Sequence, residues 1–146
     1  VTAKQAKDER LGTALGRLAF RELISEPQYH AGVAFAELYR QHHVVIGLPM
    51  PSPSSVAGLL INEGIFGASP SEPVLEAIEK LKRRFAEATD ALDACDREQR
   101  MSRGRRPTLL VHRVICTDED AMHWPEEDIG NLRVALNALV RVFRLR

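Results

Sequence analysis

An apolar seam that ends at Cys95 constrains the fold of this chain more than any other sequence feature. Its members recur at alternating spacings of four and three residues, the heptad rhythm of a helix that packs against other helices. Ser71 precedes the seam and is a suitable N-cap residue. The pattern predicts one long helix over about 74–100, with the other helices packed along it. The seam consists of Val74, Ile78, Leu81, Phe85, Ala88, Leu92 and Cys95.

The composition of the 146-residue chain favours helix over strand. Apolar residues make up 45% and charged residues 27%, as in ordinary globular domains, and only 5% are aromatic. We therefore predict an all-α fold, a single domain of five or six helices organised on the long helix. Cys95 and Cys116 are interpreted as reduced core thiols of a cytoplasmic protein. No apolar run approaches the ~20 residues of a membrane span, so no membrane association is expected.

The order of helix signals and breaks predicts four segments. Ser25 and Gln28 can form a capping box at the start of the second helix. The region after that helix holds five of the eight prolines and four of the nine glycines, with one short helix expected at Val56–Asn62. Within the single domain 1–146, the expected segments are a helical hairpin 9–46 with its first helix at 9–23, a Pro/Gly-rich insert 47–73, the long helix 74–100, and C-terminal helices in 108–146 with short turns at 108–116.

Catalysis and metal binding have no supporting motif in this sequence. There is no phosphate-binding glycine loop, no G-x-S-x-G elbow and no H-E-x-x-H helix. The five histidines form no pair with a cysteine at zinc-finger spacing. The acidic triplet Glu126–Asp128 is explained by the preference of carboxylates for a helix start. We therefore predict no enzyme, no cofactor and no metal site.

Six arginines and no lysine lie between residues 97 and 113, and this cluster makes DNA the main partner to consider. Arginine binds phosphate through a planar, bidentate fork. Gly104 and Pro107 break the helix here, so we expect exposed arginines. The alternative is an ordinary solvated loop whose arginines pair with the acids of 117–128, and both readings stay open. The candidate nucleic-acid-binding residues are Arg97, Arg100, Arg103, Arg105, Arg106 and Arg113.

Two kinds of protein association remain as alternatives. The chain can serve as an adaptor or inhibitor that meets a protein partner through the Pro-rich loop 47–55 or the acidic stretch 117–128. The long seam can also pair with a second copy and form a homo-oligomer. It spans only three heptads, and its later members Ala88 and Cys95 are small, so packing within the chain is the preferred interpretation.

Two stretches resemble short proteins of prophage and gene-transfer-agent clusters. Residues 23–32 are similar to the L-I-S-E-x-Q-Y-x-A-G helix start of that group. Residues 132–143 are similar to its terminal helix, L-x-x-A-L-x-x-L-x-x-x-F/Y. Members of the group are helical and intracellular, and some are phage-type transcription regulators; small terminase subunits have a comparable leucine-rich hairpin. The resemblance implies a DNA-handling protein of transcription regulation or DNA packaging.

Overall fold

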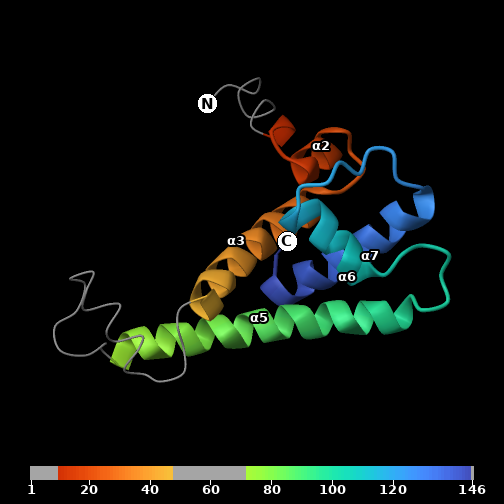
Figure 1. The fold of residues 1–146 in the computed structure, drawn as a ribbon. Coiled ribbons are helices and arrows are strands. Elements are labelled where there is room, and N and C mark those ends of the chain that lie inside the picture. The colour runs from red at the N-terminus through yellow and green to blue at the C-terminus, as the bar shows by residue number, and fades with distance from the viewer. Residues whose placement is uncertain (1–9, 48–71, 146) are drawn as a thin grey trace. The chain divides into compact units, whose positions relative to one another are not determined.

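A computed structural model of the chain describes residues 10–47 and 72–145, and these residues contain helices and no strand (Figure 1). The all-α prediction is therefore confirmed. No helix in the described residues is long and apolar enough to cross a membrane. The elements are α2 (Ala14–Phe20), α3 (Glu26–Gly47), α5 (Glu72–Glu98), α6 (Pro107–Val111), the π-helical turn η1 (His112–Cys116) and α7 (Glu126–Phe143).

The chain gathers into two compact units, which are described separately. Unit 1 comprises residues 1–37 and 87–146, and unit 2 comprises residues 38–86. The sequence predicts one domain over 1–146 and gives no signal for this division. The expected short helix at 56–62 lies outside the described residues, as does the Pro-rich loop 47–55 apart from Gly47.

The core of unit 1 forms around α7. Short helix α6 lies against α7 (Figure 1), and turn η1 lies against α6 and α2. Leu110 and Val111 of α6 and Val114 of η1 are fully buried. The C-terminal half of α5 adds the last three residues of the seam to this core, whereas the first four are only half-buried in unit 2. The seam is therefore a fully buried core stripe only over its C-terminal half. Buried core residues of unit 1 include Phe35, Ala88, Leu92, Cys95, Leu110, Val111, Val114, Leu132, Leu136 and Leu139.

The helix starts of unit 1 follow local side-chain chemistry. At the start of α3, Ser25 N donates to Gln28 Oε1 at 2.7 Å and Gln28 N donates to Ser25 Oγ at 3.3 Å, which confirms the capping box. The continuous helix expected over 9–23 is wrong, because Thr13 is extended and interrupts it. Its Oγ1 accepts a hydrogen bond from Gly16 N at 2.9 Å, so α2 begins only at Ala14.

Candidate nucleic-acid interface

Five of the six candidate arginines lie in the arginine loop, which we define as residues 97–106, including the last two residues of α5; Arg113 lies in η1. The loop joins the end of α5 to the start of α6 within unit 1 (Figure 1). Two backbone bonds fold its first part into turns, from Arg100 N to Arg97 O at 3.4 Å and from Ser102 N to Gln99 O at 3.0 Å. These turns end α5 two residues before the predicted limit at 100.

Arg105 turns inward and fastens the arginine loop to the start of α7. Its Nε donates to Asp128 Oδ2 at 2.9 Å, and its backbone N donates to Asp128 Oδ1 at 2.8 Å. The guanidinium carbon also lies 4.9 Å from the ring centroid of Trp124, a cation–π contact. Asp128 is only 5% exposed. The expectation of an exposed arginine is therefore wrong at Arg105, since its half-buried side chain anchors the loop.

Asn131, one turn further along α7, supplies the second anchor. Its Nδ2 donates to Ser102 Oγ and to Arg105 O, both at 2.8 Å, and the residue is 5% exposed. Gly104 passes so close to α7 that a Cβ there would lie 2.6 Å from both Asn131 Nδ2 and the Glu127 carbonyl oxygen. The bonds to Arg105 N and Arg105 O hold the backbone of the arginine loop against the start of α7 at that residue. We call Asp128, Asn131 and the residues bonded to them the neck of the loop.

The six sequence candidates therefore separate into two groups. Arg113, like Arg105, is engaged: its Nη1 donates to Glu119 Oε1 at 3.1 Å. These two pairs match the reading in which the arginines balance the acids of 117–128. The remaining four are exposed and form no ion pair within the described part of the chain. They recur at every third residue: Arg97, Arg100, Arg103 and Arg106.

The arginines of the last helix have mixed roles. Arg133 is half-buried, and its Nε donates to the carbonyl oxygen of Leu23 at 2.6 Å, so it ties α7 to the turn before α3. Arg141 and Arg144 are exposed, and Arg146 lies outside the described residues. Arg133 is therefore a structural residue, and the exposed basic groups of α7 are few.

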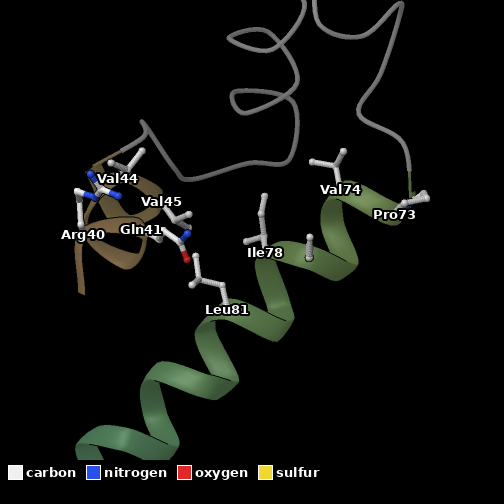
Figure 2. A pocket seen from close by; sticks show the side chains of 9 residues that line it. Arg40, Gln41, Val44, Val45, Pro73, Val74, Ile78 and Leu81 are labelled. Carbon is white, nitrogen blue, oxygen red and sulfur yellow. The ribbon is translucent and has the colours of Figure 1, made fainter. Parts of the chain in front are cut away.

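Unit 2 contains an apolar groove of about 640 Å³ between the end of α3 and the start of α5 (Figure 2). Val44, one of its lining residues, is 61% exposed, and Leu75, which follows Val74 in the sequence, is 40% exposed. The described residues of this unit include five basic and three acidic residues. The groove is thus an apolar surface in a unit with more basic than acidic residues. It is lined by Arg40, Gln41, Val44, Val45, Pro73, Val74, Ala77, Ile78 and Leu81.

Among the described residues, the two cysteine thiols and His42 have pKa values that are shifted mainly by burial. Burial raises the pKa of the Cys116 thiol to about 11, and it also raises the pKa of Cys95. Both thiols are therefore protonated, and poorly nucleophilic, at neutral pH. In unit 2, burial lowers the pKa of His42, whose ring stacks on Phe85 with centroids 3.8 Å apart. Among the described residues, no group of three or more His, Cys, Asp or Glu side chains is placed to hold a metal ion.

The chain matches no known protein family, no curated protein and no solved structure. The resemblance to prophage proteins thus remains a hypothesis that depends on the two short stretches alone. Sequence reasoning missed the neck, because it explained Asp128 by the helix dipole. The helical spacing of α7 could have indicated that Asp128 is buried. Asp128 precedes Ile129 and lies one turn before Leu132, and these two residues are buried.

Proposed function

We propose that this protein is a non-enzymatic, phage-type DNA-binding factor of transcription regulation or DNA packaging, and that the arginine loop binds backbone phosphates. The observation that carries the proposal is the set of four exposed arginines without an ion-pair partner in the described chain. Guanidinium groups left in water can form bidentate bonds to phosphate without first breaking an internal pair. Since the neck already holds the backbone, little loop ordering opposes binding.

The attraction for phosphate comes from the arginine loop and not from the net charge of the protein. The whole chain has 20 basic and 20 acidic side chains, so no overall field attracts a polyanion. Within the arginine loop, however, five arginines face a single acid, Glu98. Exposed Glu126 and Glu127 stand beside the neck at the start of α7. Phosphates are therefore expected to approach the part of the arginine loop around Arg100 and Arg103, away from these carboxylates.

A charge-removing variant tests the proposal. Replacing Arg97, Arg100, Arg103 and Arg106 with Gln leaves the Arg105 anchor intact, so the fold should persist. Each phosphate contact contributes roughly 0.9 to the slope of log affinity against log salt, so the slope should fall by about 3–4 units. DNA affinity and its salt dependence are measured by fluorescence anisotropy on a labelled duplex, with a thermal melt on the same samples.

The matched control removes the same charge from another surface. Lys80, Lys82, Arg83 and Arg84 are exposed on α5 in unit 2, and changing all four to Gln should leave the DNA slope nearly unchanged. The proposal fails if the parent protein does not bind DNA. It also fails if the arginine-loop variant and the control variant have the same salt slope.

The apolar groove of unit 2 favours a second candidate function, a protein-interaction module. A groove between two helices suits an amphipathic helix of a partner protein, whose apolar face would cover the aliphatic side chains. The excess of basic residues in unit 2 selects a partner helix with acidic flanks. Ala77→Glu in the groove should then abolish binding of a peptide with leucine on one face and glutamate on its flanks. Ala86→Glu, an exposed site outside the groove lining, is the control; equal binding by both variants contradicts this function.

A further inference from the structure

Met101 is the most exposed large apolar side chain in the described residues, with 88% of its surface accessible. Methionine is usually found inside proteins, where its flexible thioether fills gaps. Here it lies within the arginine loop, directly after Arg100 and two residues before Arg103. The loop thus combines an exposed apolar side chain with exposed cations.

The backbone around Met101 is held in place. It occupies the third position of the turn closed by the bond from Ser102 N to Gln99 O at 3.0 Å. The next residue, Ser102, accepts a hydrogen bond from Asn131 Nδ2 at 2.8 Å, which ties the turn to buried Asn131. The residue next to Met101 is thus tied to α7 by a side-chain hydrogen bond. Met101 is an exposed apolar side chain in the same short loop as four exposed arginines.

We propose that Met101 is a wedge that enters between adjacent base pairs of duplex DNA from the minor groove. The inference rests on the proposed DNA-binding function and specifies how the arginine loop meets its ligand. Proteins that insert an apolar side chain between base steps unstack them partly and bend the duplex, while basic side chains hold the flanking backbone. Arginines on both sides of Met101 can supply those contacts, and arginine is also favoured by the negative potential of a narrow minor groove.

An anionic membrane is the other surface that attracts a basic loop with an apolar tip. Stable attachment to a bilayer needs a broad amphipathic face or several apolar anchors. The arginine loop offers one methionine and no aromatic residue. A base step, in contrast, is a slot that a single unbranched side chain can fill. The observations therefore favour duplex DNA.

The experiment separates wedge action from phosphate binding by measuring bending and affinity independently. The full chain is titrated into a short duplex labelled at both ends, and energy transfer reports bending while anisotropy reports affinity. The parent should raise the transfer efficiency on binding. Met101→Ala should lose this rise, weaken binding by less than about tenfold and keep the salt slope, because the phosphate contacts remain. Met101→Leu, which restores an apolar side chain, should bend the duplex again.

Each alternative result identifies what has failed. If the parent binds DNA without bending it, or if Met101→Ala bends DNA as the parent does, the wedge is wrong and the proposed function stands. If the parent does not bind DNA, both the function and the wedge are wrong. Binding to phosphatidylserine vesicles that requires Met101, without binding to DNA, would overturn both in favour of a membrane ligand.

Discussion

Replacing Asp128 with alanine is expected to release the neck of the arginine loop and to destabilise unit 1. The substitution removes the acceptor for Arg105 Nε at 2.9 Å and for Arg105 N at 2.8 Å. It also removes a carboxylate from the first turn of α7. The exposed arginines themselves are unchanged. Any loss of DNA affinity in this variant would therefore come from the position of the loop and not from its charge.

The magnitude follows from the two bonds and their exposure. A hydrogen bond to a charged group contributes about 1.5–3 kcal/mol, so two such bonds bound the loss at about 3–6 kcal/mol. The Arg105 side chain is 38% exposed, against 7% for Asp128, so the stranded guanidinium can recover much of its hydration. This rehydration reduces the expected loss below the bound of about 3–6 kcal/mol. We therefore expect Asp128→Ala to lower the free energy of unfolding by about 2–4 kcal/mol.

Glu127→Ala is the matched control, because Glu127 is exposed in the same helical turn. It removes the same favourable charge at the helix start, worth about 0.3–1 kcal/mol, without touching the neck. Unfolding is followed in urea by circular dichroism and by the fluorescence of Trp124, the only tryptophan in the chain, which contacts Arg105. A double-mutant cycle with Arg105→Gln should give a coupling free energy above about 1 kcal/mol.

Two results would refute this reasoning. The first is a loss of stability for Asp128→Ala within about 0.5 kcal/mol of the loss for Glu127→Ala, which lies inside the usual range for a surface substitution. The second is additivity of the Asp128 and Arg105 substitutions, which would show that the ion pair contributes nothing measurable to the fold.

Three further predictions concern single sites. Ser25→Ala should cost about 0.5–2 kcal/mol, because it breaks the capping box; an unchanged urea midpoint would contradict this. Gly104→Ala should destabilise by about 1–3 kcal/mol, because its Cβ would lie 2.6 Å from the α7 backbone. Gly130→Ala, whose Cβ meets nothing within 4 Å, should stabilise by about 0.5–1 kcal/mol, and equal effects at the two glycines would refute the argument. The lowered pKa of His42 means that the folded state resists its protonation, so stability should fall as pH drops below about 6.5. Melts between about pH 7 and about pH 5 should show a smaller decline for His42→Gln, and an identical decline would contradict the assignment.

Local sequence determined the helices because the information for each lies within a few residues. The capping box at Ser25 and Gln28 joins residues three apart, and the sequence alone predicted it. The heptad spacing likewise predicted α5 to within two residues at each end, since a seam of this period packs only as a helix. The interruption at Thr13 was missed, although its side chain is a good cap, because apolar residues continued on both sides.

Tertiary structure decided which arginines remain available. Six arginines look equivalent along the chain, yet Arg105 pairs with Asp128, 23 residues away, and Arg113 pairs with Glu119. No local pattern encodes the first pairing, because it depends on how the start of α7 meets the turn after α5. The exposure of Met101 was likewise not predicted from the sequence; its neighbour Ser102 is bonded to Asn131, 29 residues away. The sequence alone shows where the arginines are in the chain. The tertiary structure decides which of them are exposed, because an ion pair forms only where the fold brings two side chains close together.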